Sequence, residues 1–202
     1  MGKSVGLAVY LAFSERALGF AQRKLEDRKS HGKEDPKRIG ERFGQTELAR
    51  PDGKLVWFHA ASVGESLSIL ELIRRLADLR EDLNFLVTTG TVTSAAMVAG
   101  RLPDRAVHQF VPVDAREPIR DFLTHRKPDL AVWTESELWP ALMYETHAAS
   151  VPMLLINARI SRETHNKWRW FPGMAKSLLR RIDFVLAQAA QTGKFLRRLG
   201  LP

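Results

Sequence analysis

The sequence predicts an α/β domain built on a Rossmann-like parallel sheet with flanking helices. Six short apolar runs recur from residue 55 onward, helical stretches separate most of them, and polar residues gather directly after the runs. Short runs that are buried on both faces are typical of parallel strands. Strands that alternate with helices form right-handed βαβ units, which build a doubly wound sheet.

The strands and helices can be placed in order. The expected strands cover residues 55–59, 85–88, 107–111, 130–134, 153–156 and 184–187. The expected helices cover residues 66–79, 93–101, 117–125, 138–149 and 173–181. The first of these helices repeats apolar residues at three-residue steps, which indicates a buried helical face; they are Leu67, Leu70, Ile73 and Leu76.

Residues 1–30 predict an N-terminal amphipathic helix that associates with a membrane. Its apolar run, residues 5–13, would rise about 13 Å as a helix and is too short for a hydrocarbon core of roughly 30 Å. A helix of this kind can lie flat on an anionic membrane. It can also pack on the core or on another subunit. The leucines that share one helical face are Leu7, Leu11, Leu18 and Leu25.

Residues 31–54 predict a polar linker outside the core, with a short helix around residues 36–43, because Pro and Gly interrupt the segment repeatedly. Residues 55–202 then form the domain itself. A chain of 202 residues with 45% hydrophobic residues is long enough to bury one core of this size.

The net charge of +8 is unevenly distributed along the chain. Residues 1–50 carry +4 and residues 157–202 carry +8, so the middle carries −4. Basic ends favour contact with an anionic surface, either membrane lipid or nucleic acid. The chain has no Cys, which excludes disulfides and thiolate zinc sites, and its six His lack ligand spacing, so we expect no metal.

The residues that can carry chemistry follow the strands, where parallel sheets bind ligands. Four loops are expected to converge on one pocket: HAASVGE at 59–65, TTGT at 88–91, ESELWP at 135–140 and NARIS at 157–161. The first loop lacks the glycine patterns of dinucleotide and P-loop sites, which disfavours both.

Two acids in these loops are open to alternative interpretations. Glu65 can cap a helix start, or it can act as a general base toward a hydroxyl. A buried acid at a strand end is costly unless it is paired or used, which favours a function for Glu135. Glu135 and Glu137 alternate sides in extended chain, so one of them faces the pocket. Arg159 can bind a phosphate or neutralise these carboxylates.

Six motifs in fixed order resemble one family. They are Arg42-Phe43-Gly44, the four loop segments above and Leu186-Ala187-Gln188. From about residue 38 to the end, the chain is similar to 3-deoxy-D-manno-octulosonic acid (Kdo) transferases, and more narrowly to their N-terminal acceptor domain. The resemblance implies the N-terminal half of a GT-B fold. The family's donor-binding segments and a further catalytic Lys lie beyond Pro202, so we expect an acceptor half that is inactive alone.

The resemblance also implies an activity. It is the inverting transfer of Kdo from CMP-Kdo to a lipid A precursor (lipid IVA) at the cytoplasmic face of the bacterial inner membrane, without cofactor or metal. Glu65 matches the family's proton acceptor and Glu135 a residue that stabilises the transition state. The expected acceptor contacts are His59, Ser62, Gly64, Thr88, Thr89, Glu137, Arg159 and Ser161. Ala141 and Ser94 depart from the family, which commonly has Asn and Gly there.

Two other functions remain open on the sequence. A pI of about 10.1 and the basic aromatic stretch at residues 167–171 also suit a nucleic-acid-binding module without catalysis. The chain can also be an inactive acceptor domain that partners another chain. Under the transferase interpretation, the partners are lipid A precursor, CMP-Kdo and an anionic membrane surface, and no nucleic acid is expected.

Overall fold

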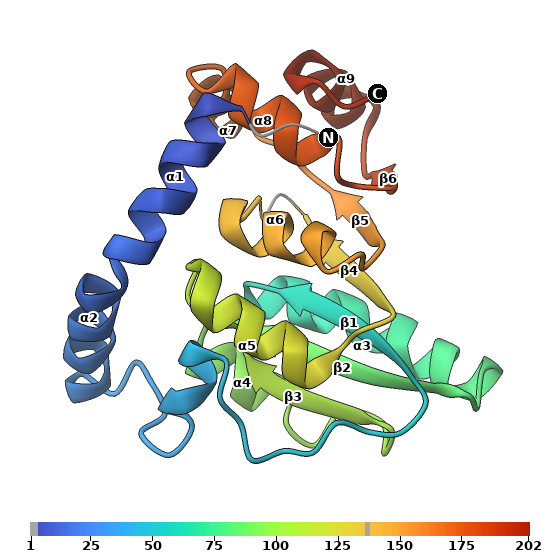
Figure 1. The fold of residues 1–202 in the computed structure, drawn as a ribbon. Helices are drawn as coiled ribbons and strands as arrows, with labels where there is room; N and C mark the ends of the chain where they lie inside the picture. The colour runs from blue at the N-terminus through green and yellow to red at the C-terminus, as the bar shows by residue number, and fades with distance from the viewer. Residues whose placement is uncertain (1–3, 136–137) are drawn as a thin grey trace.

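The computed structural model describes residues 4–135 and 138–202 and contains a parallel sheet of six strands between helical layers (Figure 1). The strand order is β3-β2-β1-β4-β5-β6, and each neighbouring pair is parallel. This is the order of a doubly wound Rossmann-like sheet. The predicted fold class is confirmed. The strands are β1 Lys54–Ala60, β2 Leu83–Thr89, β3 Ala106–Phe110, β4 Leu130–Thr134, β5 Met153–Ala158 and β6 Phe184–Ala187.

Helices cover both faces of the sheet. The helices are α1 Val5–Arg16, α2 Leu18–Ser30, η1 Ile39–Phe43, α3 Val63–Leu79, α4 Val92–Val98, α5 Arg116–Arg126, α6 Pro140–Ala148, α7 Arg162–Trp168, α8 Pro172–Leu179 and α9 Ala190–Leu199. Helix α3 packs on one face, while α1, α5, α6 and α8 pack on the other. Helices α7 and α9 were not expected from the sequence.

The larger core cluster lies on the face that α1, α5, α6 and α8 cover. At its centre Trp57 contacts Phe122 and Trp133, with ring centroids 4.8 and 5.1 Å apart. All three rings are buried. Burial of a large apolar side chain contributes roughly 1.5–3 kcal/mol, so this cluster fixes β1 and β4 side by side.

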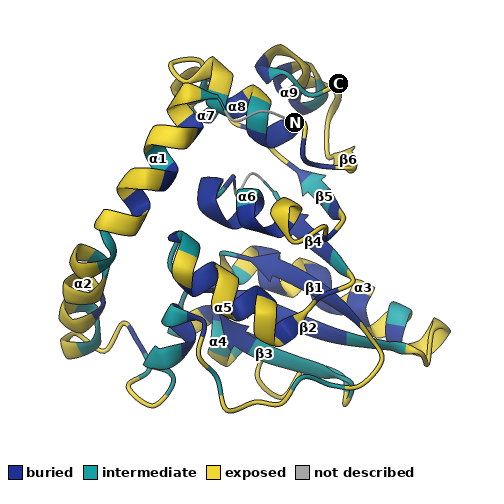
Figure 2. Cartoon of the chain, viewed as in Figure 1, coloured by how far each residue is buried: buried dark blue, intermediate teal, exposed yellow. Residues whose placement is uncertain are grey.

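The expectation of one helix over residues 1–30 is wrong, because α1 and α2 are separate helices that meet at Ala17. Leu7 and Leu11 of α1 and Leu25 of α2 are buried. These leucines therefore pack on the fold and do not face a membrane. The opposite side of α1 is exposed (Figure 2). The cause is that α1 is apolar around its whole circumference, so the sequence pattern alone could not select the face that is buried.

Residues 31–54 are not outside the folded core, which corrects the expected linker. Glu34, Glu41 and Arg42 from this segment are buried. The Glu41 carboxylate accepts from the Phe110 N–H at 2.6 Å, and the Arg38 guanidinium donates to the His108 carbonyl at 2.9 Å. Both bonds satisfy backbone groups of the edge strand β3, which protects that edge from pairing with another chain.

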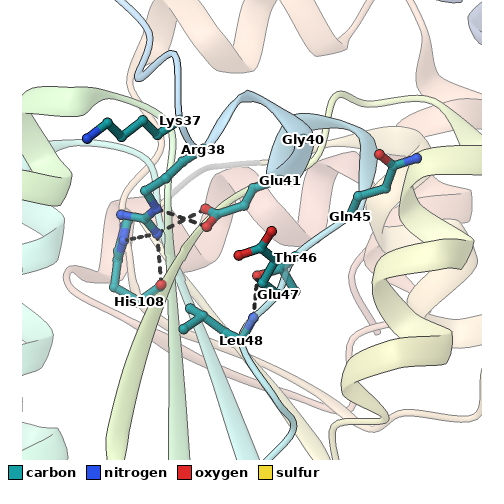
Figure 3. A pocket seen from close by; sticks show the side chains of 9 residues that line it. All are labelled: Lys37, Arg38, Gly40, Glu41, Gln45, Thr46, Glu47, Leu48 and His108. Carbon is teal, nitrogen blue, oxygen red and sulfur yellow. Dashed lines mark hydrogen bonds and ion pairs between the residues drawn. The ribbon is translucent and has the colours of Figure 1, made fainter.

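A cavity of about 730 Å³ lies beside this covered edge (Figure 3). Residues of the 37–48 segment and His108 line it. Figure 3 shows the Arg38 guanidinium bonded to the Glu41 carboxylate and to His108. The Arg38 guanidinium therefore holds the 37–48 segment on β3.

Candidate active site

The crevice of the sheet lies between β1 and β4. The chain runs through β1, β2 and β3 toward one edge and then through β4, β5 and β6 toward the other. β1 and β4 pair directly, with His59 opposite Trp133. The loops after these two strands therefore diverge, and the opening between them is where doubly wound sheets bind ligands.

Glu65 connects the two sides of this crevice. The residue lies in the first turn of α3, where the Ser62 hydroxyl caps the helix by accepting from the Glu65 N–H at 3.2 Å. Its carboxylate oxygen Oε2 accepts from the Ala61 N–H at 3.0 Å and from the Thr134 hydroxyl at 2.9 Å. Ala61 follows β1 and Thr134 ends β4. The capping interpretation of Glu65 is confirmed, because its carboxylate binds a backbone N–H before the helix.

Only one oxygen of the Glu65 carboxylate is hydrogen-bonded to the described residues. All hydrogen bonds of the carboxylate to the described residues involve Oε2, and none involves Oε1. The side chain is only 5% exposed. The two hydrogen bonds to Oε2 hold that oxygen in place. A carboxylate held through one oxygen can accept a proton from a hydroxyl through the other.

Glu135, directly after β4, and Asn157, near the end of the neighbouring β5, have an uncommon backbone conformation. Their φ values are 55° and 51°, in the left-handed region that residues other than glycine rarely adopt. Strain of this kind costs about 1–3 kcal/mol per residue and clusters at ligand sites. Both residues lie at the carboxyl ends of strands, beside the crevice. Of the four non-glycine residues with positive φ in the described part of the chain, two therefore lie where the ESELWP and NARIS motifs begin.

His59 is held inside the sheet by a chain of polar contacts. The Trp57 indole N–H donates to the Thr88 hydroxyl oxygen at 2.8 Å, and the same oxygen lies 3.0 Å from His59 Nδ1. The Thr88 hydroxyl also lies 3.4 Å from the Phe58 carbonyl, to which it can donate, so the direction of its bond with Nδ1 depends on the tautomer of His59. Nε2 is buried without a hydrogen-bond partner among the described residues. Burial lowers the pKa of His59 to about 4.

This burial predicts an acid-sensitive fold. An unfolded His titrates near 6.5, so unfolding takes up a proton between pH 6.5 and about 4. The stability that neutral His59 contributes is complete above pH 6.5 and is lost as pH falls through that window, by about 3 kcal/mol. Urea unfolding midpoints between pH 7.5 and 4 measure it. The His59→Gln variant should show a shallower fall, and an unchanged slope would contradict the assignment.

The other predicted acceptor-binding residues fall into two groups. Thr88 and Thr89 are buried, and Thr89 Oγ1 lies 2.9 Å from His108 Nε2, so their hydroxyls point into the fold. The rim residues that stay exposed are Ser62, Gly64, Arg159 and Ser161. Ser62 and Ser161 cap α3 and α7. Glu137 lies outside the described residues. The structure therefore brings Ser62 and Gly64 next to Glu65, and the binding roles stay predictions.

A second cavity, of about 420 Å³, opens at the carboxyl end of the sheet. Helix α2 forms one wall and the loops after four strands form the other. The lining residues are Ala21, Lys24, Leu25, Arg28, Glu34, Arg42, Ala61, Gly90, Thr91, Pro112, Val113, Asp114 and Trp139. Glu65 does not line this cavity itself, but its Oε2 accepts from Ala61, which does. Ala61 therefore lies between the cavity and the Glu65 carboxylate.

Three residues of this region, Thr134, Tyr10 and Asp114, were not predicted from the sequence to contribute to the site. Thr134 orients Glu65, and its only signal was its position directly before the Glu135 motif. Tyr10 donates to the Asp114 carboxylate at 2.6 Å, which also accepts from the Leu142 N–H at 2.8 Å. Burial raises the pKa of Asp114, while the hydrogen bonds from these donors lower it to a smaller extent. The contact ties α1 to the start of α6, and no local pattern indicates it.

The parallel sheet and the carboxylate at its switch point define an α/β domain of the Rossmann-like class. The chain belongs to the Kdo transferase family. The family model described as 3-deoxy-D-manno-octulosonic-acid transferase (kdotransferase) matches residues 37–202. The resemblance found in the sequence motifs is therefore confirmed.

Relatives support the same family. The chain is 35% identical over 170 residues to a 3-deoxy-D-manno-octulosonic acid transferase of Rickettsia bellii, covering 84% of the chain and 40% of the relative. It is 46% identical over 135 residues to the Rickettsia typhi transferase, covering 67% and 29%. It is 38% identical over 141 residues to a probable mitochondrial transferase of Arabidopsis thaliana, covering 70% and 32%. The chain thus spans less than half the length of these relatives, and nothing in them supports the nucleic-acid-binding alternative.

Two further observations concern the described part of the chain. None of the helices in residues 4–135 and 138–202 is long and apolar enough to cross a bilayer. Within the same residues no three His, Asp or Glu side chains are grouped so as to hold a metal ion. The expected absence of a metal stays a prediction.

Proposed function

We propose that this chain is the acceptor-binding part of a glycosyltransferase that moves Kdo from CMP-Kdo to a lipid A precursor. Family membership supports the class of reaction. The observation that carries the role of the chain is Glu65, whose carboxylate is held at the switch point through Oε2 and accepts no hydrogen bond from the described residues at Oε1.

The reaction is a direct displacement at the anomeric carbon of Kdo. Glu65 takes the proton of the acceptor hydroxyl, the hydroxyl oxygen forms the new glycosidic bond, and the bond to the CMP phosphate breaks. CMP leaves with the electron pair, and the configuration inverts. Glu135 stabilises the charge that develops during transfer, and Arg159, Ser62 and Gly64 contact the acceptor. A positioned base typically contributes about 10²–10⁴-fold to the rate.

The function is tested by product analysis. The full-length protein that contains this chain is incubated with CMP-Kdo and tetra-acylated lipid A precursor, and the lipid is analysed by mass spectrometry. We expect the mass of the precursor to increase by one or more Kdo units and free CMP to appear. Release of CMP without change in the lipid, or transfer only from a different sugar nucleotide, would contradict the proposal.

We also propose that the protein binds the cytoplasmic face of the bacterial inner membrane through α1. Val5, Val9 and Phe13 lie at four-residue spacing on the side of α1 away from the core, with exposures of 83%, 62% and 67%. Trp170 is exposed as well, near the chain segment whose Gly173 packs against Ser4 at the start of α1. An apolar helix face of this kind can insert into the interface of a bilayer.

Charge reversal on this face tests the membrane proposal. The Val9→Glu variant should bind phosphatidylglycerol vesicles about 10-fold more weakly, because an apolar group is lost and an anion is added. Leu79→Glu is the matched control, since Leu79 is also exposed but lies at the far end of α3. Sedimentation with vesicles measures both. Equal losses in the two variants, or none in Val9→Glu, would contradict the proposal.

A further inference from the structure

Helix α2 contributes two cations to the cavity at the carboxyl end of the sheet. Lys24 and Arg28 both line it, and they are four residues apart on α2. Residues at this spacing lie one above the other on a helix surface. Leu25 is buried next to them and anchors this side of the helix to the fold. The two positive groups therefore face the same space as the loops of the site.

The two cations differ in how they are compensated. Arg28 Nε donates to Glu34 Oε1 at 2.7 Å, and Glu34 Oε2 accepts from the buried Arg42 at 2.9 Å. One carboxylate is thus shared between two guanidinium groups, which leaves a positive excess. Lys24 is exposed and pairs with no carboxylate of residues 4–135 or 138–202. The ammonium group of Lys24 is therefore available to an anion.

The rest of the cavity is mainly apolar. Val113, Trp139 and Ala61 line it opposite α2, together with the buried Leu25. An uncompensated cation at the rim and an apolar interior fit a ligand that has both an anionic group and a hydrocarbon part. Ala61 lines this cavity and donates its N–H to the Glu65 carboxylate, so the cavity borders the loop that holds the proposed base.

We propose that Lys24, supported by Arg28, binds a phosphate group of an acylated, phosphorylated sugar acceptor, and that an acyl chain of this acceptor lies between Leu25, Val113 and Trp139. The inference rests on the proposed function, and it assigns α2 to the acceptor site in place of the membrane-facing role expected for this segment. Lys24 is then a residue that determines specificity for phosphorylated acceptors. Its point charge suits a phosphate, while the guanidinium of Arg28 can add paired hydrogen bonds.

The test compares Lys24→Gln with a matched control on the same helix. Arg23 is exposed, adjacent to Lys24 and absent from the cavity lining, so Arg23→Gln removes the same charge without touching the site. Binding of the chain to tetra-acylated glucosamine disaccharide bisphosphate in detergent micelles is measured for both variants. We expect Lys24→Gln to bind about 10-fold more weakly, as for the loss of one hydrogen bond to a charged group. Arg23→Gln should stay within about 2-fold.

Three further probes identify the group that Lys24 binds. With the dephosphorylated lipid, wild type and Lys24→Gln should bind equally. The disaccharide bisphosphate without acyl chains and inorganic phosphate should both bind more weakly than the lipid to wild type. Equal binding of inorganic phosphate and lipid would overturn the acyl part of the proposal. An equal loss in Lys24→Gln and Arg23→Gln, or no loss in either, would overturn the phosphate part.

Kinetics separate this inference from the proposed function. In the full-length protein, Lys24→Gln should raise KM for the phosphorylated acceptor and leave kcat within about 2-fold. If wild type binds the lipid through Lys24 but transfers no Kdo, the proposed function is wrong and the inference stands. If transfer occurs and Lys24→Gln leaves KM unchanged, the inference is wrong and the proposed function stands.

Discussion

The Glu65→Gln variant of the full-length protein should lose at least about 100-fold in kcat, because the amide cannot accept the proton of the acceptor hydroxyl. Its amide oxygen can still accept from the Ala61 N–H and the Thr134 hydroxyl, so the loop and the start of α3 keep their positions. KM for the acceptor should change much less than kcat. Steady-state rates with saturating CMP-Kdo, together with urea unfolding, measure both properties.

Glu71→Gln is the control for this variant. Glu71 lies on the same helix but forms an exposed ion pair with Arg75 at 2.8 Å. Exposed pairs contribute about 0–1 kcal/mol, so neither rate nor stability should change noticeably. Activity of Glu65→Gln within a few-fold of wild type would show that Glu65 is only a helix cap. A large loss of stability in Glu65→Gln would make the rate uninformative about catalysis and would contradict the expected retention of the cap.

The second large effect concerns stability. Arg42→Met should lower the free energy of unfolding by about 3–5 kcal/mol, because it removes one partner of a buried ion pair. Arg42 binds Glu34 and also donates to the Gly90 carbonyl at 2.5 Å and the Val111 carbonyl at 3.0 Å. These carbonyls belong to the chain segments directly after β2 and β3. Without Arg42, the loops that border the cavity lose their attachment to residues 31–54.

A double-mutant cycle checks the physical cause. Glu34→Gln combined with Arg42→Met removes the buried carboxylate that Arg42→Met leaves with Arg28 alone, so the double variant should be less destabilised than the sum of the two single variants. Arg75→Met is the matched control, since its ion pair is exposed. Urea unfolding followed by Trp fluorescence measures all four. Additive losses would mean that the Arg42 backbone contacts, and not the pair with Glu34, dominate.

The sequence predicted the sheet well because its strands are buried on both faces. Runs such as Phe85–Thr88 have few alternatives to a central parallel strand, and the observed β2 Leu83–Thr89 contains it. The N-terminal region was harder. Leu7 and Val9 are both apolar, and only the packing of α1 against α6 and α8 decides that Leu7 is buried and Val9 exposed. A helix that is apolar on all sides gives no local sign of its buried face.

The candidate site was partly predictable for a similar reason. Strand ends indicated where Glu65, Glu135 and Arg159 would lie, because the carboxyl ends of parallel strands share one edge. The partners were not predictable. The bond from Thr134 to Glu65 joins residues 69 apart in sequence, and it depends on β4 pairing with β1. The position of α2 over the cavity depends in turn on the turn at Ala17, where no helix-breaking residue occurs.

A structure of the protein with the acceptor disaccharide bound tests the central claim most directly. The claim is that Glu65 Oε1 faces the hydroxyl that receives Kdo, across the opening between β1 and β4. We expect that hydroxyl within about 3.2 Å of Oε1, with Oε2 still bonded to Ala61 and Thr134. An acceptor bound with its hydroxyl groups remote from Glu65, for example in the cavity beside β3, would contradict the account.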